Sequence, residues 1–160
     1  MPLRTKLLPI AIAIGATASS SFAQLEEVIV TAQKREQSIS DVPVSITAIT
    51  RDTIEILGIA SAQDIGALTP NVQISDSPGN ANGLTINIRG SVTINPALTL
   101  EPTAGLYIDG VYVGKNTGGI FDVMDLERVE VLRGPQGTLY GKNTVGGAVN
   151  FVSRRPGDTF

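Results

Sequence analysis

The sequence predicts a small α+β domain with a mixed sheet of about four strands, short helices and long loops. Runs in which apolar and polar residues alternate recur along the chain, and a period of two is typical of strands with one buried face. Two short segments begin with helix-capping residues and end with helix-stopping residues. The 17 glycines and 9 prolines among 160 residues favour many turns over long helices.

The composition argues against several classes of function. The chain has no cysteine and no histidine, which removes disulfides, Cys/His zinc sites, cysteine nucleophiles and the commonest general base. The 12 basic and 15 acidic residues give a net charge of −3, whereas binding of nucleic acid needs a clustered basic surface. No carboxylate pair stands beside a nucleophile. We therefore expect no enzyme, no cofactor and no nucleic-acid partner.

Residues 1–23 have the pattern of a secretory signal peptide. Arg4 and Lys6 form a basic beginning, the apolar stretch Leu7–Ala18 follows, and small residues precede the expected cleavage site. A membrane helix is the alternative, but about 12 apolar residues are too few for a bilayer that needs about 20. We expect a cleaved leader and an exported chain that begins at Gln24.

Residues 24–42 are expected to form a flexible tether that carries one extended apolar segment. The β-favouring run Val28–Val30 is followed by a polar tract, 33–41, with no core of its own. A partner can capture such a segment by strand addition. The alternative is an ordinary edge strand of the domain. The packed domain is expected over residues 43–156.

The predicted domain begins with a strand and two short helices. Apolar residues alternate from Val42 to Thr50, which indicates the strand. Thr50 can cap a helix that stops at Gly58, because glycine readily adopts the left-handed conformation that ends helices. Ser61 can cap a second helix that runs to about residue 68.

Strands and exposed loops alternate over the middle of the chain. Val72–Ser75 and Leu84–Ile88 have strand patterns and enclose a loop at 76–83 that is rich in glycine and asparagine. A second loop, 93–103, carries two prolines. Both loops are expected to be exposed.

A hairpin is predicted next. Residues 106–113 are apolar on both sides of Asp109 and Gly110, a pair that suits a type I′ turn. A glycine-rich loop at 114–119 and a short helical turn at 123–126 are expected to follow.

A strand, a glycine-rich loop and a second strand end the chain. Residues 128–131 alternate, Ala148–Val152 reads as a strand, and five glycines and a proline lie between them. A phosphate cradle is one interpretation of the loop, because Gly141–Lys142 resembles the end of a Walker A motif. The spacing argues against it, since Gln136 stands where the motif needs glycine and Asn143 where it needs Ser or Thr.

The same stretch closely resembles the end of the plug domain of TonB-dependent outer-membrane receptors. The motifs that carry this resemblance are Leu132–Gly141, Gly146–Asn150, Arg154–Pro156, Ile88–Gly90 and Tyr107–Val111. It extends over nearly everything from Glu27 to Pro156. The resemblance implies the plug fold, a role in import and a location in the outer membrane.

The resemblance also implies partners and site residues. In this family the plug lies inside a 22-stranded barrel. TonB pairs in the periplasm with a TonB box and transmits force drawn from the proton-motive force. The residues that match the TonB box are Glu27, Val28, Ile29, Val30, Thr31 and Ala32. Arg89 and Arg133 match plug arginines that pair with barrel glutamates. The residues that match plug loops holding a polar small molecule or metal chelate are Asn80, Asn82, Asn95, Lys115 and Asn116.

The chain is expected to lack the barrel. A barrel of 22 strands of about 10 residues each needs several hundred residues, and residues 157–160 would only begin the first strand. Two functions stay open: the plug of an importer, of ferric siderophores or similar scarce solutes, and a free-standing periplasmic ligand-binding module without transport activity. An enzyme that uses the glycine-rich loop for phosphates is a third alternative.

Overall fold

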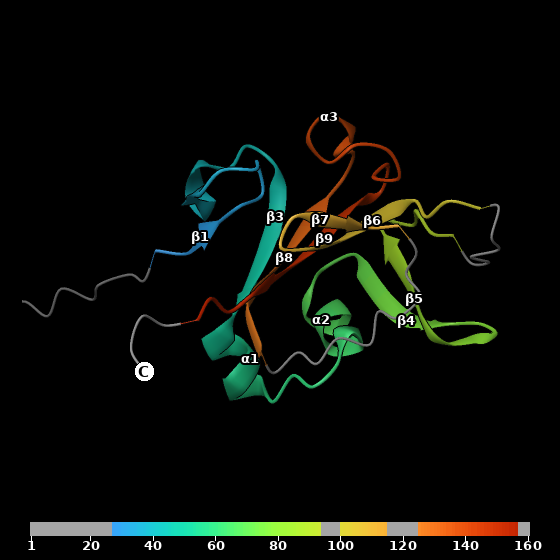
Figure 1. Ribbon diagram of the computed structural model, residues 1–160, viewed down its shortest axis with the longest axis horizontal. Coiled ribbons are helices and arrows are strands. Elements are labelled where there is room, and N and C mark those ends of the chain that lie inside the picture. Colours follow the sequence, from blue (N-terminus) through green and yellow to red (C-terminus); the bar gives the residue numbers. More distant parts are fainter. Residues whose placement is uncertain (1–26, 94–99, 115–124, 157–160) are drawn as a thin grey trace, which may run out of the picture.

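A mixed sheet forms the centre of the computed structural model, which describes residues 27–93, 100–114 and 125–156 (Figure 1). The described strands of this sheet number five and have the order β3-β8-β9-β6-β7. β6 and β9 run parallel, and the other neighbours run antiparallel. The bounds are β3 (Ser45–Thr50), β6 (Ala104–Ile108), β7 (Val111–Val113), β8 (Leu126–Arg133) and β9 (Gly147–Ser153).

The α+β class and the central mixed sheet are confirmed, with five described strands where about four were predicted. Strand patterns do not specify partners, and the chain distributes its strands over the central sheet and two short two-stranded sheets among the described residues. The short sheets pair β1 (Ile29–Val30) with β2 (Gln37–Ser38), and β4 (Val72–Ser77) with β5 (Asn80–Ile88). The helical elements are η1 (Ile39–Asp41), α1 (Arg51–Leu57), α2 (Ala62–Leu68) and α3 (Gly137–Tyr140).

The capping residues define α1 and α2 as predicted. The Thr50 side chain accepts a hydrogen bond from the backbone N–H of Thr53, and Gly58 ends α1 in the left-handed conformation with φ 63°. Ser61 and Asp64 form a reciprocal capping box at the beginning of α2. None of the described helices is long and apolar enough to cross a membrane.

The β4–β5 hairpin replaces a predicted loop. Residues 76–83 were expected to be irregular, but β4 extends to Ser77 and β5 begins at Asn80, with a turn at Pro78 and Gly79. A β-bulge at Asp76/Ser77 adjusts the register so that the pairing continues. The polar residues Asp76, Ser77 and Asn80 are therefore part of the hairpin, because Asp76 pairs with Leu84 and Ser77 with Asn80.

The turn between β6 and β7 has the predicted geometry. Asp109 and Gly110 both have positive φ, 50° and 78°, as a type I′ turn requires. The predicted loop at 114–119 and helical turn at 123–126 lie mostly outside the described residues. Within the latter, Leu126 is already part of β8.

Both faces of the central sheet are covered. Val129, Val131 and Val149 face a core that α1, α2 and the β4–β5 hairpin complete (Figure 1). Leu132 and Ala148 face the opposite way, into a second cluster formed with the N-terminal residues. Successive strand residues point to opposite faces, so β8 and β9 are buried over most of their length.

The N-terminal strap, residues 27–42, departs from the expectation of a flexible tether. Val30 and Ala32 are 0% exposed, and Val42 joins them in the second cluster. The expectation overlooked that the second sheet face is itself apolar, so that burying these side chains on it is favourable. In the described structure the strap is therefore docked, with β1 paired to β2.

Candidate functional site

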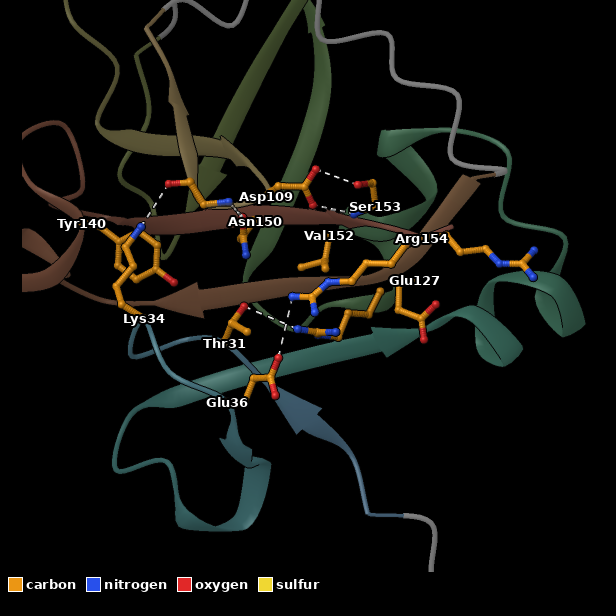
Figure 2. Close-up of a pocket in the computed structure, with 13 residues that line it drawn as sticks. Thr31, Lys34, Glu36, Asp109, Glu127, Tyr140, Asn150, Val152, Ser153 and Arg154 are labelled. Atoms are coloured by element: carbon orange, nitrogen blue, oxygen red, sulfur yellow. Dashed lines mark hydrogen bonds and ion pairs between the residues drawn. The ribbon is translucent and has the colours of Figure 1, made fainter. Parts of the chain in front are cut away.

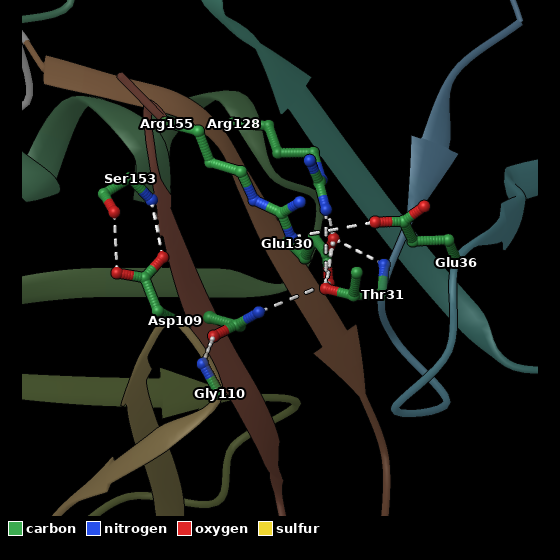
Figure 3. Close-up of polar contacts among 9 residues, drawn as sticks. Thr31, Glu36, Asp109, Gly110, Arg128, Glu130, Ser153 and Arg155 are labelled. Atoms are coloured by element: carbon green, nitrogen blue, oxygen red, sulfur yellow. Dashed lines mark hydrogen bonds and ion pairs between the residues drawn. The ribbon is translucent and has the colours of Figure 1, made fainter. Parts of the chain in front are cut away.

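A buried carboxylate joins the strap to the central sheet. Glu130 on β8 is 0% exposed. It accepts hydrogen bonds from the Thr31 backbone N–H at 2.7 Å and the Thr31 hydroxyl at 3.0 Å, and its Oε1 lies 2.8 Å from Arg128 Nε (Figure 3). A buried charge is costly unless it is paired and hydrogen-bonded, and these contacts supply both requirements. Glu130 thus fixes the strap at Thr31.

Asn150 on β9 extends this network to the β6–β7 turn. Its side-chain amide donates to Glu130 Oε2 over 3.5 Å, a long contact, and its Oδ1 accepts from the Gly110 backbone N–H at 3.0 Å. Asn150 is 2% exposed, so both ends of its amide are used inside the protein. One side chain therefore connects the Glu130 cluster with the turn.

A second contact fixes the strap at Lys34. Its ammonium group donates to the Gly110 carbonyl at 3.1 Å and lies 4.4 Å from the ring centroid of Tyr140 and 5.2 Å from that of Tyr107. Such positions over aromatic rings are attractive for cations. Burial and the nearby Glu130 and Tyr107 raise the pKa of Tyr140, so its hydroxyl stays protonated and neutral beside the cation.

These contacts border a polar hollow of about 720 Å³ (Figure 2). Its lining includes Thr31, Lys34, Glu36, Asp109 and Arg155, from the strap, the β6–β7 turn and the end of β9. Arg155 reaches across it to Glu36 at 3.8 Å, between side chains that are 91% and 67% exposed. Both signs of charge are present on its lining. In the ranges described, no three candidate ligands gather around a metal position.

Arg89 and Arg133 come together at the C-terminal ends of β5 and β8. Arg89 follows β5 with φ 53°, and its guanidinium lies against Gly134, 3.3 Å from where a Cβ would stand. Arg133 ends β8 and donates to the Pro70 carbonyl at 3.2 Å, while its Nε is buried without a partner. No carboxylate among the described residues lies within ion-pair distance of either arginine. The two cations form one patch that offers unused donors.

Of the residues predicted to hold a ligand, only some lie in the part of the chain that the structure describes. Asn80 and Asn82 lie in β5, so the expectation that they belong to a loop is wrong for the backbone. Asn95, Lys115 and Asn116 lie outside the described residues. The proposed ligand site therefore stays a prediction.

Three residues of the strap network were not singled out from the sequence: Lys34, Glu130 and Asn150. A signal for Glu130 was present. It occupies a position on β8 whose period-2 neighbour Leu132 is apolar, and a charge on a buried face requires a partner. Lys34 and Asn150 carry no such signal, because their roles depend on contacts between distant parts of the chain.

The fold is that of a receptor plug, and the family comparison agrees. A family model described as TonB-dependent Receptor Plug Domain matches residues 38–148, more than half of the chain. The chain belongs to this family, which confirms the resemblance found in the sequence.

Individual relatives are receptors and transporters. The pesticin receptor of Yersinia pestis is 35% identical over 165 residues, which cover 97% of this chain and 23% of the receptor. The vitamin B12 transporter BtuB of Vibrio vulnificus is 33% identical over 132 residues, 80% of this chain and 20% of the transporter. The ferric yersiniabactin uptake receptor FyuA from Yersinia pestis superposes with a TM-score of 0.65 at 35% identity, over 77% of this chain and 19% of the receptor. The chain thus spans about a fifth of these relatives.

Proposed function

We propose that the chain acts as the plug of a TonB-dependent outer-membrane importer and carries the strand on which TonB pulls. The observation that supports this most directly is the position of β1, an extended apolar strand immediately ahead of the residues that match the plug family. The relatives named as receptors and transporters support import over the alternative of a free-standing periplasmic module. The chain would be exported and would lie in the outer membrane within a receptor barrel.

The TonB-pairing strand is proposed to be Glu27–Ala32. This segment contains no proline, so every residue can donate to a β-ladder, and Val28–Val30 favours extended backbone. Val28 O already accepts from Ile39 N. Alternate residues of a strand direct their backbone groups to opposite edges, so the N–H of Ile29 points away from β2. Ile29 is thus available to an added strand.

A proline and alanine comparison at Ile29 tests this pairing. Ile29→Pro removes a backbone donor from the outward edge, whereas Ile29→Ala only truncates a side chain that is 40% exposed. We expect the proline variant to lose binding to the periplasmic domain of TonB and the alanine variant to retain most of it. Equal binding of both variants would contradict pairing through Glu27–Ala32.

Arg89 and Arg133 are proposed to lock the plug to carboxylates of the barrel wall. The unpartnered Nε of Arg133 and the absence of a described acid near either residue support this role. Loss of one partner from a poorly screened pair costs about 3–5 kcal/mol. To test this, the chain is fused to the barrel of the pesticin receptor of Yersinia pestis. Arg89→Gln and Arg133→Gln should then loosen the plug and admit large antibiotics; unchanged resistance would remove the locking role.

The substrate is proposed to be a ferric siderophore or a similar scarce, polar solute. The relatives FyuA and BtuB are named for ferric yersiniabactin and vitamin B12, which supports this class. The residues proposed to contact it are Asn80, Asn82, Asn95, Lys115 and Asn116. In the fused receptor, alanine at both Asn82 and Asn116 should weaken substrate affinity and leave membrane insertion intact. Unchanged affinity would exclude these two residues from the site.

A further inference from the structure

Each edge of the proposed TonB-pairing strand already makes hydrogen bonds within the chain, although the N–H of Ile29 on the outward edge stays available. On one edge, Val28 O accepts from Ile39 N at 3.0 Å, and Val30 lies opposite Gln37 in β2. On the other edge, the Thr31 N–H donates to Glu130 at 2.7 Å. β2 therefore stands where an added strand could pair, and Glu130 uses the next donor of the opposite edge.

Side chains of this strand are also buried within the chain. Val30 and Ala32 are fully buried against Leu132, Tyr140 and Ala148 in the second cluster. A partner strand that lifts this segment from the sheet has to expose both apolar side chains. Docking on the plug and pairing with a pulled partner are thus alternative states of the same residues.

The turn that follows the strand is fixed at both of its ends. Lys34 N donates to Thr31 O at 2.9 Å, and Lys34 has a positive φ of 60°, so residues 31–34 form a tight turn. Glu130 holds Thr31 at one end. Gly110 O and the ring of Tyr140 hold the Lys34 ammonium at the other.

These contacts close a ring of hydrogen bonds. It runs from Thr31 to Glu130, to Asn150, to Gly110, to Lys34 and back to Thr31. Members of one network are energetically coupled, so loss of one contact weakens its neighbours. The ring ties the strap to β8, to β9 and to the β6–β7 turn at once.

We propose that Glu130 and Lys34 form a latch that keeps the strand in a self-docked state and thereby lowers the affinity of the plug for TonB. The inference rests on the proposed pairing of Glu27–Ala32. When the competent state is only a fraction of the population, the apparent dissociation constant rises by the inverse of that fraction. Contacts remote from TonB would in this way set how strongly TonB engages.

The first measurement compares two forms of the same strand. A synthetic peptide of residues 24–34 has no latch, whereas the chain without its expected leader has one. In titration calorimetry with the periplasmic domain of TonB, the peptide should bind about tenfold more tightly than the chain, the ratio expected when the strand is undocked in about a tenth of the chains. Equal affinities would overturn the latch alone. A peptide that does not bind would overturn the pairing itself, and the latch with it.

Variants of the two anchors extend this test. Lys34→Met keeps the aliphatic stem but removes the donor to Gly110 O, and Glu130→Gln keeps the shape but removes the charge. Each should tighten TonB binding by the chain roughly three- to tenfold, the range for loss of one such contact. Lys34→Met in the peptide should change nothing. If it tightens peptide binding as much as chain binding, the latch is overturned.

A matched control removes a lysine elsewhere. Lys142 forms an exposed ion pair with Glu101, at a position outside the strap network, and Lys142→Met should leave TonB affinity of the chain unchanged. Lys34 is itself exposed, so the Lys34→Met variant should fold. The test therefore holds even if the Glu130→Gln variant does not fold. Anchor variants that bind TonB no better than the parent chain or the Lys142→Met control would overturn the proposal.

Discussion

Removal of Arg128 is the most direct probe of the buried pair beneath the strap. The Arg128→Met variant leaves the Glu130 carboxylate, which is 0% exposed, with neutral donors from Thr31 and Asn150 only. The Arg128 side chain is 16% exposed, so solvent screens the pair weakly. Breaking a buried pair from one side costs about 3–5 kcal/mol. Because the Thr31 donors stay, we expect a loss near the lower figure.

The loss should be visible in thermal and urea unfolding. A cost of about 3 kcal/mol corresponds to a fall in Tm of roughly 10 °C for a domain of this size. Adding Glu130→Gln to Arg128→Met removes the orphaned charge and should restore part of the stability. Arg51→Met, which breaks the exposed pair Arg51–Glu55, is the matched control and should change little. A loss below about 1 kcal/mol for Arg128→Met, or a double variant no more stable than the single one, would refute the reasoning.

Two further predictions concern stability. Gly147→Ala should destabilise the chain by about 3 kcal/mol or more, because its Cβ would stand 2.2 Å from Leu132 O at a φ of 151°, whereas Gly137→Ala meets nothing within 4 Å and should be tolerated; similar urea midpoints would contradict this. Hydrogen bonds from Ser61 and from two backbone N–H groups lower the pKa of Asp64. The stabilisation is therefore present above the ordinary pKa of Asp64 and is lost as pH falls through its folded-state pKa, so the stability difference between the parent and Asp64→Asn should shrink in acid; a difference independent of pH would count against it.

Local features of this fold were predictable, and long-range ones were not. The caps of α1 and α2 and the Asp109–Gly110 turn depend on residues within a few positions of each other, and the structure has all three. The docking of the strap depends on Thr31 and Glu130, which are 99 residues apart. The sequence pattern of an apolar strand followed by polar residues does not distinguish a free tether from a segment docked on a sheet.

The candidate site shows the same difference between predictable local features and unpredictable long-range contacts. The sequence resemblance identified Arg89 and Arg133 singly, but only the folded chain places their guanidinium groups around Gly134 and the Pro70 carbonyl. The glycine- and asparagine-rich stretch at 76–83 indicated a loop. Part of its backbone is nevertheless paired, since Asp76 lies opposite Leu84 and Ser77 opposite Asn80.

The central claim is that TonB engages this plug through Glu27–Ala32. The most direct measurement follows the backbone amide resonances of the isotope-labelled chain as the unlabelled periplasmic domain of TonB is added. We predict that the resonances of Val28–Thr31 change most, together with that of Glu130 as the strap leaves it, and that Ile29→Pro abolishes these changes. Binding of TonB that leaves Val28–Thr31 unchanged and alters resonances elsewhere would contradict the claim.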